Sequence, residues 1–220
     1  MVLVVTSCAP APSPPTQMSY MSRADATAVQ LELKMTSGAL HIQGGASKLL
    51  DAAFDIDPQE KKPRFLYVER GSAGYGQIYQ MLDSPPLFGV APDTWNIKLS
   101  NRVLLGCLLT LGTGKADVDL RGLWLMRLVI KGNPDELKLD LRDIRTSGLT
   151  VFILNAPGPT TIVLPNHLGV QVRSKNPLIE IEGPLQQVGP DWVNAAYGIS
   201  PITISIVIDE EAGPVHLIAS

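Results

Sequence analysis

Three aspartates are the residues of this chain best suited to chemistry. Asp117 and Asp119 alternate with apolar residues and therefore share one strand face, and Asp140 holds a matching position in a second copy of the same phrase. Paired carboxylates on one face can divide the roles of general acid and general base, as they do in glycoside hydrolysis. The sequence thus offers an outward acidic face that could bind or cleave a polysaccharide.

The same aspartates have a simpler interpretation as a solvated strand face. The alternation that turns them outward also turns Lys138 and Glu180 outward, and charged residues are almost always exposed. Outward charges also keep sheets from associating. We therefore predict no catalytic residue, cofactor or metal site, and we keep Asp117, Asp119 and Asp140 as a candidate interaction face.

Other motifs that suggest chemistry fail on spacing or setting. Segment 112–115 (Gly-Thr-Gly-Lys) lacks the first glycine and the Ser/Thr of a phosphate-binding loop, and a strand follows it instead of a helix. The scattered His41, His167 and His216 do not have the spacing of metal ligands. Cys107 lies in an apolar run, where burial raises the pKa of the thiol and leaves it unreactive.

The elements that position the aspartates are two copies of one strand-turn-strand unit between Leu109 and Leu141. Each copy has an apolar strand, a Gly-containing turn and a strand in which apolar and charged residues alternate. One such unit cannot bury its apolar face alone, whereas stacked units share a continuous core. Comparable positions at Leu120, Leu141, Leu164 and Ile181 recur at intervals close to one two-strand rung of a solenoid.

Strands are predicted along most of the chain. Segments 65–70 and 75–80 are typical of a hairpin, and segment 47–54 fits either a helical turn or a strand. Strands at 202–208 and 215–218 close the series, and we expect them to cap the stack. The predicted fold class is all-β: a single-domain, β-solenoid-like (β-helix-like) stack of short strand repeats. An antiparallel β-sandwich is the alternative.

Composition excludes several function classes. The chain has 220 residues, 45% of them hydrophobic, which suits one substantial core. Its net charge is −3 and its Lys and Arg residues are scattered, so we expect no nucleic-acid partner. The longest nearly uninterrupted apolar run, residues 103–112, is too short to span a bilayer as a helix.

The first eight residues resemble the end of a secretory signal that runs into a bacterial lipobox. Residues 5–7 (Val-Thr-Ser) precede Cys8, which would then carry a lipid and hold the protein at a membrane surface. The alternative is an ordinary free cysteine and a cytoplasmic protein, since no Lys or Arg precedes the apolar run. We expect a signal or lipobox segment over 1–7, a Pro/Ala/Ser-rich spacer over 8–27 and a folded domain over 28–220.

Several phrases resemble a known bacterial family. Segment 111–123 with its twin repeat, segment 74–78, and segment 194–197 before an Ile-x-Ile-x-Ile strand are similar to the toast-rack proteins and to the LiaF-like C-terminal domain of cell-wall-active-antibiotics-response proteins. The resemblance covers about residues 29–218 and departs from the family at 132–135, where Gly-Asn-Pro-Asp replaces a Gly-x-Gly turn. It implies a β-solenoid-like body at the envelope, a non-catalytic role in envelope stress, and no catalytic residues.

Together these observations predict a non-catalytic, extracytoplasmic protein of the bacterial cell envelope that serves as a scaffold, sensor or interaction module. The expected partners are a membrane surface, reached through the lipid anchor, and an envelope protein or cell-wall polysaccharide. The alternative is a polysaccharide-binding adhesin or polysaccharide-active enzyme that uses Asp117, Asp119 and Asp140. A deep groove lined by these acids would favour the alternative, and a flat solvated face would favour the scaffold.

Overall fold

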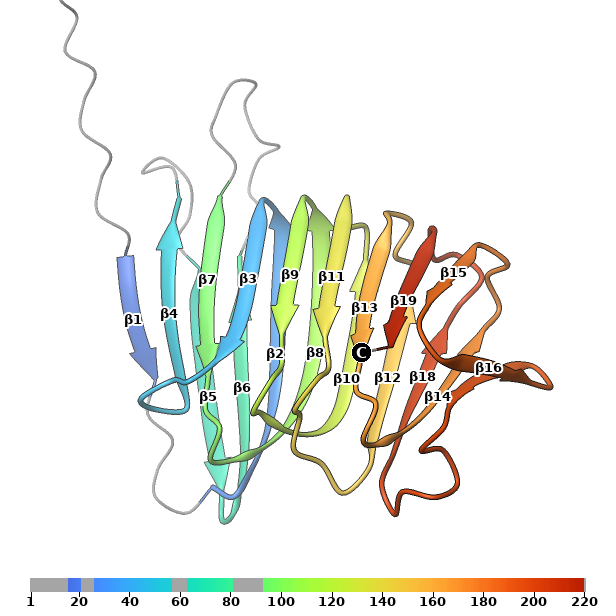
Figure 1. The fold of residues 1–220 in the computed structure, drawn as a ribbon. Coiled ribbons are helices and arrows are strands. Elements are labelled where there is room, and N and C mark those ends of the chain that lie inside the picture. Colours follow the sequence, from blue (N-terminus) through green and yellow to red (C-terminus); the bar gives the residue numbers. More distant parts are fainter. Residues whose placement is uncertain (1–15, 21–25, 57–62, 81–92, 220) are drawn as a thin grey trace, which may run out of the picture.

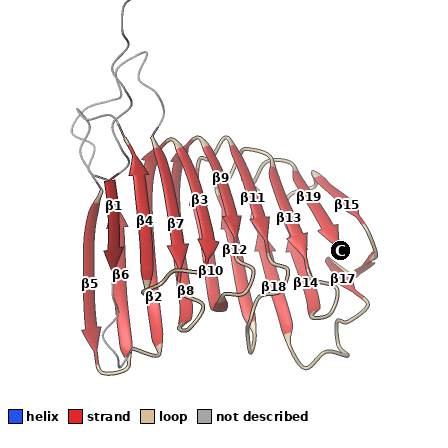
Figure 2. Cartoon of the chain, turned by 60° about the vertical axis from the view of Figure 1, so that its left-hand side comes forward, coloured by secondary structure: helices blue, strands red, loops and turns tan. Residues whose placement is uncertain are grey.

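Two large sheets pack face to face in this chain (Figures 1 and 2). The structure, a computed structural model, describes residues 16–20, 26–56, 63–80 and 93–219. Sheet A contains, in spatial order, β1 (Thr16–Tyr20), β4 (Leu50–Asp55), β7 (Thr94–Leu99), β3 (Ala39–Gly44), β9 (Lys115–Asp119), β11 (Glu136–Asp140), β13 (Thr160–Leu164), β19 (Val215–Ala219) and β15 (Ile179–Glu182). Sheet B contains β16 (Leu185–Val188), β17 (Asp191–Asn194), β14 (Gly169–Ser174), β18 (Thr203–Ile208), β12 (Leu149–Leu154), β10 (Trp124–Gly132), β8 (Leu104–Thr113), β2 (Ala28–Ser37), β6 (Ala73–Tyr79) and β5 (Arg64–Arg70).

Successive strands form rungs, with one strand of each rung in each sheet. β8 leads into β9, β10 into β11 and β12 into β13, and neighbouring rungs pair in parallel in both sheets. Antiparallel pairs occur only at the two ends of the described stack, between β1, β4 and β7, between β5 and β6, and between β14, β17 and β16. The predicted all-β, solenoid-like stack is therefore confirmed, and the antiparallel sandwich is excluded as its main architecture.

Alternation places the core between the sheets. On β11, Leu137 and Leu139 are buried while Lys138 is exposed, and the same pattern recurs on the neighbouring strands. Because the register repeats from rung to rung, the inward side chains of both sheets join in one hydrophobic core. Within the described ranges we find no helix at all, and so none with the length and apolar character of a membrane span.

Glycines close the corners where the chain passes from sheet B to sheet A. A Cβ atom on Gly112 would lie 1.7 Å from the carbonyl oxygen of Thr36, and one on Gly114 would lie 1.9 Å from that of Gly38. Gly114 also has a φ of +119°, which side chains disfavour. The Gly-Thr-Gly-Lys segment is thus a corner packed against the backbone of the neighbouring rung.

The C-terminal strands lie inside the stack. β18 pairs in parallel with β12 and β14, and β19 pairs in parallel with β13 and β15. The expectation that these last strands cap the stack is therefore wrong. The edge positions fall instead to β15 (Ile-Glu-Ile-Glu) and β16 (Leu-Gln-Gln-Val), which are short and partly polar and so protect the sheet edges better than the apolar β18 would.

Two N-terminal segments refine the expected domain plan. Thr16–Tyr20, within the expected spacer of residues 8–27, forms β1 and pairs with β4. Segment 47–54, for which helix and strand were both open, contains most of β4. Residues 1–15, which include the expected signal segment and Cys8, lie outside the described residues.

Replacing Gly114 with alanine should destabilise the stack by at least about 3 kcal/mol, because the new Cβ would collide with a backbone oxygen. Gly71→Ala is the matched control: Gly71 also has a positive φ (+58°) but has open space around its Cβ position, so its cost should stay near about 1 kcal/mol. Urea unfolding monitored by circular dichroism measures both, and equal losses would contradict the corner argument.

Candidate functional site

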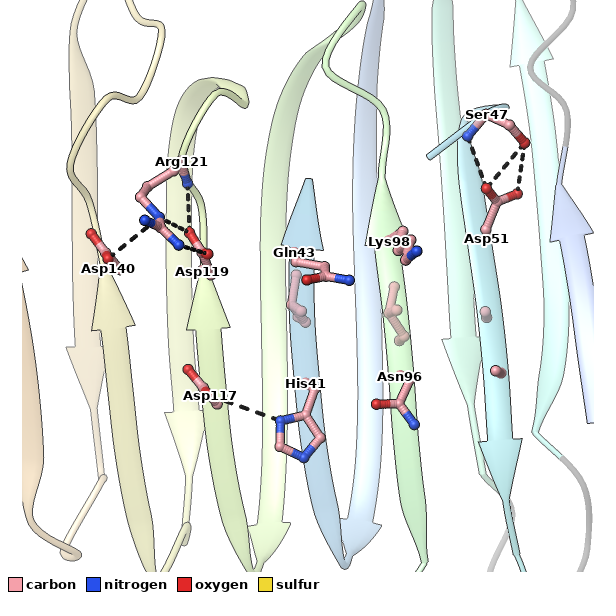
Figure 3. Close-up of a pocket in the computed structure, with 14 residues that line it drawn as sticks. His41, Gln43, Ser47, Asp51, Asn96, Lys98, Asp117, Asp119, Arg121 and Asp140 are labelled. Carbon is pink, nitrogen blue, oxygen red and sulfur yellow. Dashed lines mark hydrogen bonds and ion pairs between the residues drawn. The ribbon is translucent and has the colours of Figure 1, made fainter. Parts of the chain in front are cut away.

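The three predicted aspartates lie on the outward face of sheet A (Figure 3). Asp117 and Asp119 flank the buried Val118 on β9, and Asp140 on β11 is the cross-strand partner of Asp119. Asp117 pairs in register with Lys138, and not with another acid. The structure thus brings two carboxylates together and sets the third one position further along the same face.

A groove with a volume of about 890 Å³ lies on this part of the outward face of sheet A (Figure 3). Its polar lining comes from neighbouring strands and from the ends of two loops: His41, Gln43, Ser47, Asp51, Asn96, Lys98, Asp117, Asp119, Arg121 and Asp140. On one side Ser47 donates from its backbone N–H to Asp51 at 2.8 Å. The groove lining as a whole contains both carboxylates and cationic side chains.

A repeated Asp-Leu-Arg motif holds two of the aspartates. Asp119 accepts hydrogen bonds from the backbone N–H of Arg121 at 3.1 Å and from its Nη2 at 2.6 Å. Asp140 accepts the same pair of bonds from Arg142, at 3.0 and 2.7 Å. Arg121 Nε also lies 3.6 Å from Asp140 Oδ2, so the motif links two rungs. Neither arginine was predicted to have a role, although the repeated Asp-Leu-Arg motif was a usable signal.

The electrostatics of the motif oppose acid catalysis at Asp119. Hydrogen bonding from the Arg121 guanidinium holds the pKa of Asp119 below its usual value. The general acid of a glycosidase needs a raised pKa instead. Asp117 is more open, with a side chain 60% exposed and Oδ2 4.0 Å from His41 Nδ1.

The remaining candidates lie apart from one another. His167 is exposed, and His216 Nε2 lies 3.3 Å from Glu182 Oε2. Across the described parts of the chain, no group of three or more His, Cys, Asp or Glu side chains could hold a metal ion. Cys107 is buried, which confirms the prediction of a core residue, and burial raises its pKa to about 12. Cys8 lies outside the described residues.

Comparison with known families gives the fold a name. Residues 11–162, well over half of the chain, match the family described as the N-terminal domain of toast_rack, DUF2154. The chain belongs to the toast-rack family. The matched part of this toast-rack chain is not separable from the rest, because β18, which follows it in sequence, pairs with β12 inside it.

The fold is shared with a solved structure. The toast-rack chain resembles the crystal structure of a candidate cell adhesion protein from Clostridium sporogenes, with a TM-score of 0.81 and 23% identity over 94% of this chain and 100% of the other. A candidate adhesin from Bacteroides fragilis aligns over 94% and 99% of the two chains, but its TM-score of 0.29 and identity of 8% support no argument. None of the curated proteins matches the toast-rack chain.

The Asp119–Arg121 bond should give stability a measurable pH dependence. Because the pKa of Asp119 is lower in the folded state, its contribution is present above the unfolded value and is lost as pH falls through the folded value. Both side chains are partly exposed, so Asp119→Asn should cost no more than about 1 kcal/mol at pH 7, and this cost should vanish in acid.

Urea unfolding at neutral and acidic pH measures this difference. Asp117→Asn, at a more exposed carboxylate, is the control and should change stability by less than about 0.5 kcal/mol at either pH. A cost for Asp119→Asn that is the same at both pH values would show that the ionised bond to arginine does not contribute.

Proposed function

We propose that this toast-rack protein is a non-catalytic component of the bacterial cell envelope that serves as a scaffold, sensor or interaction module. One observation supports this above all: two of the three acids best placed for chemistry, Asp119 and Asp140, are bound to arginines of the fold. Carboxylates held in this way are poorly suited to exchange protons with a substrate, and Arg121 also lies 3.6 Å from Asp140 on the next rung. Membership of the toast-rack family favours the same function.

The proposal includes a lipid anchor on Cys8 at the outside of a membrane. Support comes from residues 5–8 (Val-Thr-Ser-Cys), which fit the end of a lipobox, and from the prolines that separate them from β1. β1 is the edge strand of sheet A, so the tether enters the stack at one end. A LiaF-like link to envelope stress is part of the proposal and is supported by the resemblance of residues 29–218.

A second candidate function is that of a polysaccharide-binding adhesin. The groove over sheet A favours it, since Asp117, His41 and Asn96 are exposed along that groove. The Clostridium sporogenes protein, which has the same fold, is named as a candidate cell adhesion protein, and that name makes the adhesin worth testing here. A polysaccharide-active enzyme has less support, because the pKa of Asp119 is lowered.

Replacing Asp117, Asp119 and Asp140 together with alanine separates these functions. The triple variant should fold, with a stability loss of no more than about 1 kcal/mol per site, because the arginines bonded to Asp119 and Asp140 are partly exposed and Asp117 is an open carboxylate. It should also restore envelope-stress resistance to a deletion strain. A thermal melt and an in vivo stress assay measure the two properties, and a folded variant that fails to complement would favour the adhesin or enzyme.

Cys8→Ser should release the protein from the membrane fraction of its native host after a high-salt wash. The wash removes proteins held only by charge, so retention of the wild type reports the lipid. Cys107→Ala is the matched control and should stay with the membrane, because that thiol is buried in the core. Retention of the Cys8→Ser variant after the wash would contradict the anchor.

A further inference from the structure

The outward face of sheet B carries a group of exposed apolar side chains. Of the nine large hydrophobic side chains exposed in the described residues, five lie on β5, β6 and β10, each between 37% and 46% exposed: Leu66, Val68, Tyr75, Trp124 and Met126. These strands are joined through β2 and β8 in the order β5-β6-β2-β8-β10. The five side chains therefore belong to one continuous face, and an exposed apolar face of this kind marks an interaction site.

A β-bulge shapes the β10 side of this face. The pairing of β10 with β8 shifts register between Leu125 and Arg127, so the consecutive residues Met126 and Arg127 are both exposed. Bulges re-aim side chains in this way and are frequent at functional sites. Gly106 on β8 leaves room for the side chain of Gln30, because a Cβ atom on Gly106 would lie 2.4 Å from Gln30 Oε1. The side chain of Met126 lies next to the same position.

The same five strands carry five outward cations and one outward carboxylate. The cations are Lys34, Arg64, Arg70, Arg127 and Lys131, and we call them, together with the five exposed apolar residues, the sheet B patch. The carboxylate is Glu32, which accepts a hydrogen bond from Tyr75 at 2.7 Å. The patch is therefore electropositive.

The patch cations differ from four cations on the outward face of sheet A, which are paired with carboxylates. On sheet A, Lys115, Arg121, Lys138 and Arg142 each lie between 2.6 and 3.2 Å from a carboxylate. Among the described residues, the patch cations form no such ion pair, and Arg127 instead lies 5.3 Å from the centroid of the Phe152 ring. Unpaired cations beside exposed aromatic rings are available to an anionic partner.

An anionic lipid surface fits this composition. Trp and Tyr rings settle at the membrane interface, where one end is apolar and the other hydrated, and Lys and Arg reach from there to phosphate groups. Five neighbouring strands spaced by about 4.8 Å present these groups over roughly 20 Å of one sheet face. A broad face of this kind suits a planar partner.

The position of the tether supports the same partner. Cys8 lies eight residues before Thr16, the first residue of β1, and eight extended residues reach at most about 28 Å. β1 and β5 lie at the same end of the stack (Figures 1 and 2). A lipid on Cys8 would therefore hold this end, and with it the sheet B patch, close to the bilayer.

We propose that the sheet B patch binds the surface of a membrane that contains anionic phospholipid, with Trp124 and Leu66 in the interface and Lys34 and Lys131 against lipid phosphates. The orientation in the cell rests on the lipid anchor proposed above. Binding itself does not, because an unlipidated chain carries the same patch. The test can therefore separate the two proposals.

The experiment uses the full chain with Cys8→Ser, sedimented with vesicles of phosphatidylglycerol and phosphatidylcholine or of phosphatidylcholine alone. Binding should require phosphatidylglycerol and weaken with salt. Each cation removed should cost about fivefold in affinity, so Lys34→Gln with Lys131→Gln should cost about twenty-five-fold. Trp124→Phe should abolish most of the blue shift in tryptophan emission on binding, because Trp95 is already buried and Trp192, on β17 outside the patch, packs against the core.

Lys115→Gln with Lys138→Gln is the matched control, since it removes the same charge from the outward face of sheet A and should leave binding unchanged. Equal losses in the two double variants, or no binding to phosphatidylglycerol, would overturn the proposal. So would a photo-crosslinker in place of Trp124 that captures an envelope protein in cells instead of phospholipid. Retention of the wild type through a high-salt wash reports the Cys8 anchor separately.

Discussion

Contact between the backbones of successive rungs is the constraint on which the rest of this structure depends. At the corners the chains approach so closely that a Cβ on Gly112 or Gly114 would overlap a carbonyl oxygen of the neighbouring rung. Only glycine fits there, and the strands on either side are then held in the register that aligns their apolar residues. The continuous core follows from these corners as much as from the apolar side chains.

The two outward faces use their charges in opposite ways. On sheet A the Asp-Leu-Arg motif repeats with the rung, and Arg121 lies close to carboxylates of two rungs. Each such exposed bond contributes little alone, but the repeated bonds favour one register over its neighbours. The cations of the sheet B patch form no such ion pair among the described residues and stand among exposed apolar side chains. The charges of the Asp-Leu-Arg motif are thus paired within the fold, and those of the sheet B patch are left for contacts outside it.

The rungs were predictable from local sequence patterns. The features that depend on contacts between distant segments were not. Alternation at Leu137 and Leu139 reports burial directly, because the side-chain period of a strand is two. Alternation fails at the β10 bulge, where one extra residue exposes both Met126 and Arg127. The aspartates were placed on the correct face, but their pairing with arginines required reading the repeat as a unit. No local pattern signals that β18 lies between β12 and β14. Each of these strands has one edge that can pair with a parallel strand, and their own sequences do not specify which strand fills it.

The interior position of the C-terminal rung has a consequence for how the molecule is made. β19 completes sheet A by pairing with β13, a strand more than fifty residues earlier, for example through Thr160 and Val215. Such distant pairing is slow to form, because a long loop must close first. Until β18 and β19 have been synthesised, β12, β13, β14 and β15 each have an open side, and this part of the stack cannot close. The synthesis of β18 and β19, and not the completion of the earlier rungs, therefore sets the earliest moment at which the stack can close.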